Sequence, residues 1–315
     1  MECLVHEHSI TLGHALDVST WHTYSLALNS YITFCCSHSL PLEPTNDTLS
    51  FYTVYMCSHI KPGSIDNYLS SICNELEPFF PAICSARKSR LVTHTLCGCK
   101  QLQGATVYCK CALTNNDVRS ALLSLSSSTQ YDNILFLAQL FTGFHALMCL
   151  EELVWPDAVH LRSHHKLTLC TTVVCDGGLQ YSFLLPAHKA ALFFNGSRIL
   201  VHQDLALLGT VPLFAQYLAL WDSQFALHVE LWIRSDGALL TCSWFLRHLQ
   251  ALFPDNVAGY SMCSGGVTAL AEHGTPPDLI QAARCWSSDA FRGYIRWHPV
   301  LLAALLFVRN SVPTT

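Results

Sequence analysis

The spacing of apolar residues changes once along this chain of 315 residues, and that change limits the folds open to it. From residue 20 to about residue 103, apolar residues recur every three or four positions, which is typical of amphipathic helices. Residues 166–175 and 179–186 are rich in strand-forming residues, and Asp176, Gly177 and Gly178 between them favour a tight hairpin. A third strand is expected at 198–203, after which helical spacing resumes. The pattern predicts a mostly α protein with a small antiparallel sheet.

The same pattern divides the chain into two domains. We expect a helical domain at 1–105, an extended linker at 106–113 and an α+β domain with the sheet at 114–315. Helices are expected at 20–38, 46–57, 64–77 and 88–100 in the first domain, and at 115–125 and 132–148 in the second. Thr114 is expected to cap the helix that follows it.

The amino-acid composition limits the kinds of binding partner and the cellular compartment that we expect for this chain. Charged residues make up 12% of the chain, apolar residues 51%, and the formal net charge is −5. These values exclude a disordered chain and argue against a general nucleic-acid binder, which needs Lys and Arg to neutralise phosphates. The first residues lack the apolar core of a signal peptide, and Pro212 and Gln216 interrupt the most apolar stretch, 205–221. We therefore expect an intracellular protein with no membrane span, whose 16 Cys are reduced thiols.

Two Cys-x-Cys pairs raise the question of a metal. Cys97 and Cys99 form one pair, and Cys109 and Cys111 form the other. Zinc knuckles usually space their Cys residues by two, and no His-x-x-x-His partner follows here. Thiols without metal are favoured, and no cofactor is expected; a thiol-rich zinc protein is the third-ranked alternative.

Three segments of the second domain carry a family resemblance: Gly143-FHALMCLEEL, the hairpin region up to Leu185-PAHKAALFFNG, and Gly259-YSMCSGGVTALAEHGTPPDLIQAARCWSSDAFRGYIRWHP. Together they resemble the tyrosine recombinase (phage-integrase-like) family, as found in Crypton-type and related fungal mobile elements. The resemblance covers nearly the whole chain, since the first domain is similar to the family's core-binding (SAM-like) domain. It implies DNA recombination and integration, DNA as the partner, a homo-oligomer on DNA and a nuclear location. It implies no membrane as a partner and no small-molecule substrate.

The resemblance also implies roles for individual residues. In the family a Tyr attacks a DNA phosphodiester and forms a 3′-phosphotyrosyl intermediate, two Arg and a His or Trp bind the phosphate oxygens, and a Lys protonates the leaving 5′ oxygen. Such cations and donors stabilise the negative charge of the transition state. The matching positions are Tyr294 for the nucleophile, Lys189 for the general acid and Trp286 for a retained phosphate-binding residue.

Four other positions depart from the family pattern. Cys149 stands where the first Arg is expected, Tyr260 and Cys263 replace the His and the second Arg, and Cys285 replaces the cation before Trp286. A thiol is a weak donor and a thiolate repels phosphate, so the resemblance implies an impaired or inactive enzyme. The alternative is a non-catalytic DNA-binding or protein-binding remnant of a mobile-element recombinase.

The same kind of nucleotide change in a codon would produce each of these replacements. Each needs a single C-to-T mutation, and so do four residues at positions where the family often has basic residues, namely Trp21, Cys109, Cys111 and Trp297. Our hypothesis is a mobile-element gene decayed by cytosine deamination, with chance enrichment in Cys as the alternative. Cations that remain available for DNA are Arg87, Lys88, Arg90, Lys100 and Lys110, with Arg162 and Lys166 in the second domain. The cluster at 87–90 is equally consistent with a solvated helix start.

Overall fold

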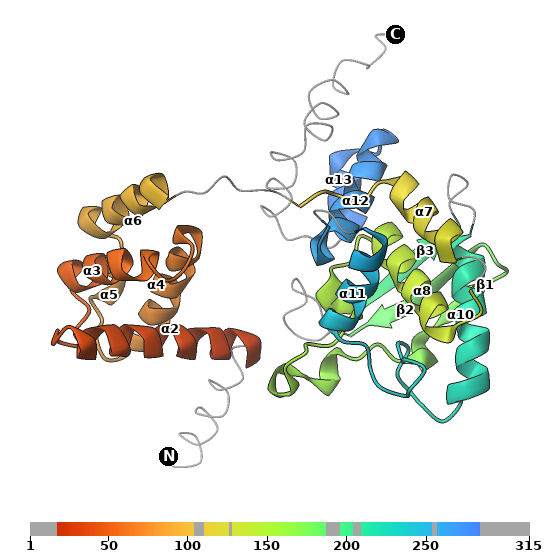
Figure 1. Cartoon of the computed structure of the whole chain (residues 1–315), viewed down its shortest axis with the longest axis horizontal. Coiled ribbons are helices and arrows are strands. Elements are labelled where there is room, and N and C mark those ends of the chain that lie inside the picture. The colour runs from red at the N-terminus through yellow and green to blue at the C-terminus, as the bar shows by residue number, and fades with distance from the viewer. Residues whose placement is uncertain are drawn as a thin grey trace, which may run out of the picture. The chain divides into compact units, whose positions relative to one another are not determined.

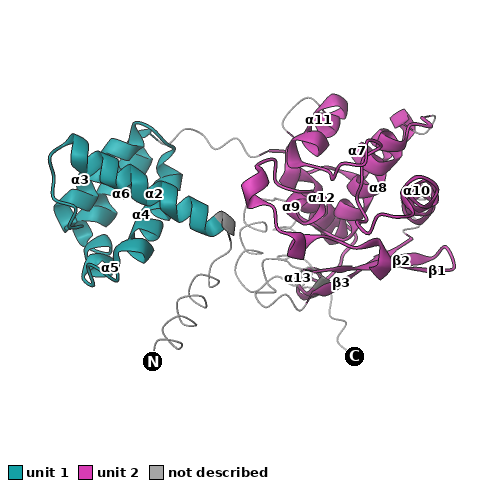
Figure 2. Ribbon diagram, turned by 90° about the horizontal axis from the view of Figure 1, so that it is seen from below, with its two compact units in different colours: residues 1–108 teal, residues 109–315 magenta. Residues whose placement is uncertain are grey.

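A computed structural model describes residues 18–103, 110–125, 128–186, 196–203, 209–253 and 257–283. The chain divides into two compact units, residues 1–108 and 109–315, coloured separately in Figure 2. The described parts are mostly helical and contain a three-stranded antiparallel sheet in the second unit (Figure 1), which confirms the predicted fold class. No helix in these ranges has the length and apolar character needed to cross a membrane.

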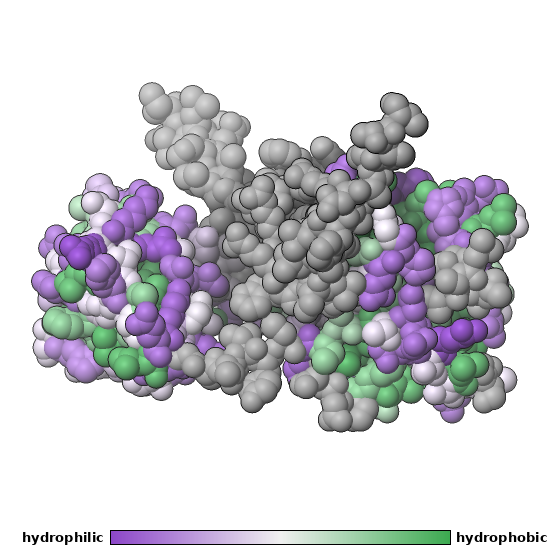
Figure 3. Space-filling model, turned by 90° about the horizontal axis from the view of Figure 1, so that it is seen from above, coloured by the Kyte–Doolittle hydropathy of each residue, from purple (hydrophilic) through white to green (hydrophobic). Residues whose placement is uncertain are grey.

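The first unit is a small helical bundle. Its helices are α2 (Val18–Ser37), α3 (Asn46–Cys57), α4 (Pro62–Leu76), α5 (Ile83–Arg87) and α6 (Arg90–Gln103). The helix α3 has the predicted bounds because Thr45 and Thr48 cap its first turn reciprocally. Buried aromatic rings join α2 to α3, with Tyr31 and Tyr52 edge to face at 5.4 Å between ring centres. Hydrophilic residues predominate on the face of this unit drawn in Figure 3.

The second unit is built around one buried helix. Its helices are α7 (Asn115–Leu125), α8 (Tyr131–His145), α9 (Leu150–Leu153), α10 (Thr210–Phe225), α11 (Cys242–Leu252), α12 (Gly259–Glu272) and α13 (Pro277–Ala283). Nearly every residue of α8 is buried, so it serves as the core around which the others pack. Thr114 caps α7 as predicted, since its Oγ1 accepts a hydrogen bond from the Asp117 N–H at 3.2 Å.

The sheet contains β1 (Val174–Asp176), β2 (Gln180–Leu185) and β3 (Ser197–His202) in that order, all antiparallel. Gly177 and Gly178 both have positive φ, as the predicted hairpin turn requires. The sheet packs against α10, because the buried rings of Tyr181 and Phe214 stack at 3.8 Å. The sheet and α10, which are distant in sequence from α8, are thereby held next to it (Figure 1).

The first predicted strand is wrong over most of its length. Residues 164–166 and 170–172 form 3₁₀ turns, and only Val174–Asp176 joins the sheet. The reason is a competing partner: the Cys170 N–H donates to the Val229 carbonyl at 2.8 Å, and the Leu231 N–H donates to the Thr168 carbonyl at 2.9 Å. These bonds turn the backbone away from the ladder. The helix predicted to end at 148 also ends earlier, at His145, since Leu147 has a φ of 56°.

The start of α12 is held against α8 and the end of the linker. Gly265 lies on the Leu113 carbonyl and Gly266 lies on the Phe144 carbonyl, so closely that a Cβ at either position would overlap these backbone oxygens. The Leu113 N–H donates to the Ser261 carbonyl at 2.9 Å. The Lys110 N–H donates to the Tyr260 hydroxyl, also at 2.9 Å, although 150 residues separate the two. These two hydrogen bonds thus hold residues 110–113 against the first turns of α12.

We predict that Gly266→Ala destabilises the protein by about 1–3 kcal/mol, because the backbone carbonyl that its methyl meets cannot move aside as a side chain can. Gly63→Ala is the matched control, since no atom lies within 4 Å of a Cβ built there. Thermal unfolding followed by circular dichroism measures both. Equal unfolding temperatures for the two variants would contradict the close packing.

We also predict that Tyr260→Phe speeds trypsin cleavage after Lys110 by about fivefold, because one hydrogen bond of about 1 kcal/mol no longer holds the linker. Tyr68→Phe, in the other unit, controls for a generic loss of a tyrosine hydroxyl. The cleavage rate at this bond is read by mass spectrometry of the fragments. Unchanged rates in Tyr260→Phe would show that the hydrogen bond does not restrain the linker.

Candidate functional site

The predicted catalytic positions that the structure describes meet where α9 and α12 touch. A Cβ on Gly259, at the start of α12, would lie 2.7 Å from Leu150 Cδ2, in the first turn of α9. Cys149 immediately precedes Leu150, and Tyr260 immediately follows Gly259. The structure therefore brings the expected positions of the first Arg and of the His to the same junction.

Cys149 caps α9 with its backbone. Its N–H donates to Glu152 Oε2 at 2.7 Å, which satisfies a donor at the helix start. The side chain is half-buried. The Glu152 carboxylate thus contacts the Cys149 backbone, and its negative charge disfavours a phosphate anion at this position.

Tyr260 and Cys263 have different surroundings on α12. Tyr260 is 45% exposed, and its hydroxyl accepts the hydrogen bond that holds the linker. Cys263 is fully buried where α12 packs into the unit, next to the buried Met262. At this position a thiol fits as a small apolar group. The junction carries no cation at any of the three described positions.

A small hollow lies beside α9. The residues that line it include Glu152, Glu230, Lys166, Trp155 and Trp232. Two acidic residues and one basic residue are therefore among those that line it. The Trp232 Nε1–H is buried and has no hydrogen-bond partner among the described residues.

Four predicted site residues fall outside the described residues. These are Lys189, Cys285, Trp286 and Tyr294. Their roles in the family pattern stay predictions, together with the codon hypothesis for Cys109 and Trp297, which also lie outside the described residues.

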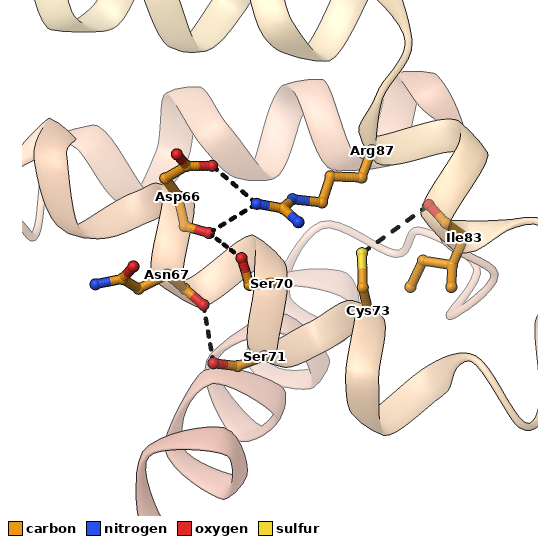
Figure 4. A network of polar contacts seen from close by, with 7 residues as sticks. All are labelled: Asp66, Asn67, Ser70, Ser71, Cys73, Ile83 and Arg87. Atoms are coloured by element: carbon orange, nitrogen blue, oxygen red, sulfur yellow. Dashed lines mark hydrogen bonds and ion pairs between the residues drawn. The ribbon is translucent and has the colours of Figure 1, made fainter. Parts of the chain in front are cut away.

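The predicted DNA-contacting cations lie at the surface. Arg87 has a close anionic partner among the described residues: its Nη2 donates to Asp66 Oδ1 at 3.0 Å and to the Asp66 carbonyl at 3.3 Å (Figure 4). Exposed ion pairs of this kind contribute little to stability, so Arg87 can exchange Asp66 for a phosphate. The remaining cations are exposed, namely Lys88, Arg90, Lys100 and Lys110.

The thiols of the described residues do not form a metal centre. Within those ranges no group of three or more His, Cys, Asp or Glu side chains is placed to hold a metal ion. Cys97 is exposed while Cys99 is buried, so the pair does not present two thiols on one surface. Burial raises the pKa of Cys73 to about 11 and that of Cys57 to about 12. These buried groups are neutral core thiols near neutral pH.

Sequence reasoning overlooked two features of this region. The hydrogen bond between Lys110 and Tyr260 joins residues too far apart in sequence for any local pattern to show it. The other is the run His160-Leu-Arg-Ser-His-His-Lys166, in which only the Arg and Lys were singled out. Its density of histidine was a signal available from the sequence alone.

Comparisons with known proteins bear on the fold. No protein-family model and no curated protein sequence matches the chain. Among solved structures, the chain is similar to XerH site-specific recombinase bound to its difH substrate, at 13% identity and a TM-score of 0.55, with 91% of this chain and 79% of that one covered. It is similar to a lambda integrase dimer bound to a core site, at 12% identity and a TM-score of 0.57, covering 92% and 93%. It is also similar to Tn1549 transposon integrase in complex with a circular intermediate DNA, at 12% identity and a TM-score of 0.55, covering 87% of each chain. The chain therefore has the fold of these tyrosine recombinases and integrases.

Proposed function

We propose that this chain is a DNA-binding protein of the tyrosine recombinase type whose strand-cleavage step is impaired. Support for DNA as the partner comes from the similar structures, which were solved with a recombination substrate, a core site or a circular intermediate DNA bound. Support for a mobile-element origin comes from the resemblance of residues 259–299 to Crypton-type recombinases. By the same resemblance, the chain assembles as a homo-oligomer on DNA and acts in the nucleus.

In the proposed chemistry the Tyr294 hydroxyl attacks a backbone phosphorus. The Tyr294 hydroxyl gives up its proton to solvent as the Tyr–O–P bond forms, the P–O5′ bond breaks, and the departing 5′ oxygen takes a proton from Lys189. Because the bond energy is retained in the phosphotyrosyl ester, the strands can be rejoined without a nucleotide cofactor. The transition state gathers negative charge on the phosphate oxygens, so its stabilisation depends on fixed cations.

The observation that carries the proposal is the absence of cations at the described positions of the α9–α12 junction. Cys149 and Cys263 stand at the two Arg positions, and Cys263 is fully buried. Loss of one preorganised donor to a developing oxyanion raises the barrier by about 2.7–4 kcal/mol. With two Arg replaced, and without simple additivity, cleavage is slowed by roughly three or more decades.

A binding role without chemistry is the second candidate. Tyr260 favours it, because this residue at the expected His position makes a structural hydrogen bond with the linker at 2.9 Å. A protein that keeps the fold and binds DNA or another protein is stabilised by this hydrogen bond and needs no catalytic cation.

We predict that the unaltered chain yields no covalent adduct with a suicide DNA substrate over the time an intact recombinase needs. The variant Cys149→Arg, Tyr260→His, Cys263→Arg, Cys285→Arg restores the cations and forms an adduct through Tyr294. The same variant with Tyr294→Phe is the matched control and forms none. Since Cys263 is buried, Cys149→Arg is also made alone, and its folding is checked by circular dichroism. Adduct formation by the unaltered chain at ordinary rates would refute the impairment.

We further predict a salt-dependent affinity for duplex DNA, with log K falling linearly with log salt because bound phosphates release counterions. Lys88→Gln with Arg90→Gln reduces the slope by about 0.9 for each phosphate that is no longer neutralised. Lys61→Gln, an exposed cation of the same unit at the start of α4, is the control and leaves the slope unchanged. Fluorescence anisotropy gives the slopes. No binding at low salt would exclude the proposed function.

A further inference from the structure

Two cysteines of the first unit lie where α4 ends and α5 begins. Cys73 belongs to the last turn of α4, and Cys84 is the second residue of α5. The connection between the helices folds back on itself, because the Phe80 N–H donates to the Leu76 carbonyl at 2.8 Å and the Ile83 N–H donates to the Phe80 carbonyl at 3.0 Å. The start of α5 is thereby held beside the end of α4.

The contacts of the two sulfur atoms converge on this place. Cys73 Sγ lies 4.0 Å from the carbonyl oxygen of Ile83, the residue that precedes Cys84 in the chain (Figure 4). Cys84 Sγ donates to Glu77 Oε1 at 3.5 Å, and the Glu77 N–H donates to the Cys73 carbonyl at 2.9 Å. Each sulfur therefore contacts a residue that adjoins the other cysteine.

The thiol of Cys73 also responds to its neighbour. Burial raises the pKa of Cys73 to about 11, and the Cys84 thiol adds to this rise as a neighbouring charge and hydrogen-bond partner. The Arg87 guanidinium acts in the opposite direction and favours the Cys73 thiolate. Interactions of this kind are effective only over a few ångströms. The two thiols are thus near neighbours.

The two thiols differ in their access to solvent. Cys73 is 4% exposed, whereas Cys84 is half-buried. Exchange between a thiol and a disulfide requires that one sulfur reaches the other, so access limits which cysteine reacts first. A small solute can reach Cys84, while the sulfur of Cys73 is reached from Cys84. This is the arrangement of an exposed cysteine beside a resolving one.

A second thiol pair of the same unit differs in this respect. Cys57 of α3 and Cys99 of α6 are both buried, and the Cys99 thiol contributes, after burial, to the raised pKa of Cys57. The two pairs are alike in having neighbouring thiols. They differ in that neither Cys57 nor Cys99 is open to a solute from outside.

We propose that Cys73 and Cys84 form an oxidation site, at which a low-molecular-weight disulfide converts the two thiols into a disulfide that joins α4 to α5 and stabilises the first unit. Disulfides of reducing compartments are usually transient and redox-sensing, and an excess of small thiol reverses such a reaction. The inference is independent of DNA binding, since it concerns only the thiol pair and the helices that carry it.

The reaction consists of two exchanges. The Cys84 thiolate attacks one sulfur of glutathione disulfide; a bond between Cys84 and glutathione forms, the S–S bond of the reagent breaks, and one glutathione leaves. The Cys73 thiolate then attacks Cys84 Sγ, the bond between the two cysteines forms, and the second glutathione leaves. The two cysteine protons pass through solvent to the departing glutathione thiolates. Two cysteines are oxidised and one glutathione disulfide is reduced to two thiols.

The test exposes the folded full chain to glutathione disulfide, blocks the remaining thiols with N-ethylmaleimide in denaturant and maps the cysteines by mass spectrometry. Digestion with Glu-C and chymotrypsin separates the two cysteines, because Glu-C cleaves after Glu75. We expect the link between Cys73 and Cys84 to form at least about tenfold faster than a link between Cys57 and Cys99, whose thiols react only when the bundle opens.

Three variants assign the roles of the two sulfurs. Cys73→Ala should stop the reaction at the mixed disulfide of Cys84 with glutathione, whereas Cys84→Ser should leave Cys73 unmodified. Cys57→Ala is the matched control for the loss of a buried thiol, and it should form the link between Cys73 and Cys84 at the rate of the unaltered chain. Circular dichroism confirms that each variant is folded.

Hydrogen exchange measures the effect of the link on the first unit. A disulfide restricts the unfolded chain, so the amides of α4 and α5 should exchange about tenfold or more slowly after oxidation. The oxidised Cys57→Ala chain should show the same slowing, and the Cys84→Ser chain should show none. Unchanged exchange in the linked chain would overturn the stabilising role.

Three results of the mapping would overturn the oxidation site. The first is a mixed disulfide at Cys84 that persists in the unaltered chain as it does in Cys73→Ala, which would show that the two sulfurs do not meet. The second is a link between Cys57 and Cys99 that forms as fast, and the third is the absence of any modification at Cys84. Because the assay contains no DNA, a failure of the proposed function leaves its outcome unaffected.

Discussion

The close approach of α12 to α8 is the interaction on which the candidate site depends. Gly265 and Gly266 present bare backbone to the Leu113 and Phe144 carbonyls, so α12 meets two segments more than a hundred residues away in sequence at van der Waals distance. This packing also fixes the contacts that the first turn of α12 makes with its neighbours. With α12 fixed in this way, its first turn reaches Leu150 of α9 on one side and Lys110 of the linker on the other. The positions of the candidate site residues on α9 and α12 therefore follow from helix packing, to which the Tyr260 hydroxyl adds its hydrogen bond with the Lys110 N–H.

Parts of this arrangement could be predicted from local chemistry. The helix α3 was predictable from its apolar spacing and from the early Asp47, whereas its cap, Thr45, is known only from the structure; α7 followed from Thr114, a residue type that satisfies helix starts. The hairpin followed from two glycines that accept positive φ. Each of these signals lies within a few residues of the structure that it determines.

A distant partner decides the features that local sequence patterns did not show. Residues 166–173 have strand-forming composition, but their backbone groups bond to Val229 and Leu231, which no local pattern shows. Tyr260 stands at the position where the family pattern expects His, yet its hydroxyl bonds to Lys110 across 150 residues. The meeting of α9 and α12 was accessible only through the family resemblance, and the roles of Lys189 and Tyr294 still rest on that resemblance.

Cysteine at an expected arginine position has different consequences for chemistry and for folding. At position 263 a guanidinium would have to be held in the interior of the second unit by anionic or polar partners, whereas the thiol is fully buried there as a small apolar group. Replacing a buried charge by an apolar group of suitable size is often neutral or stabilising, while removing it from a phosphate site slows the reaction by decades. On the proposed ancestry, loss of the catalytic cations removes the chemistry without removing the packing of α12. A chain can then retain the recombinase fold after its cleavage activity has gone.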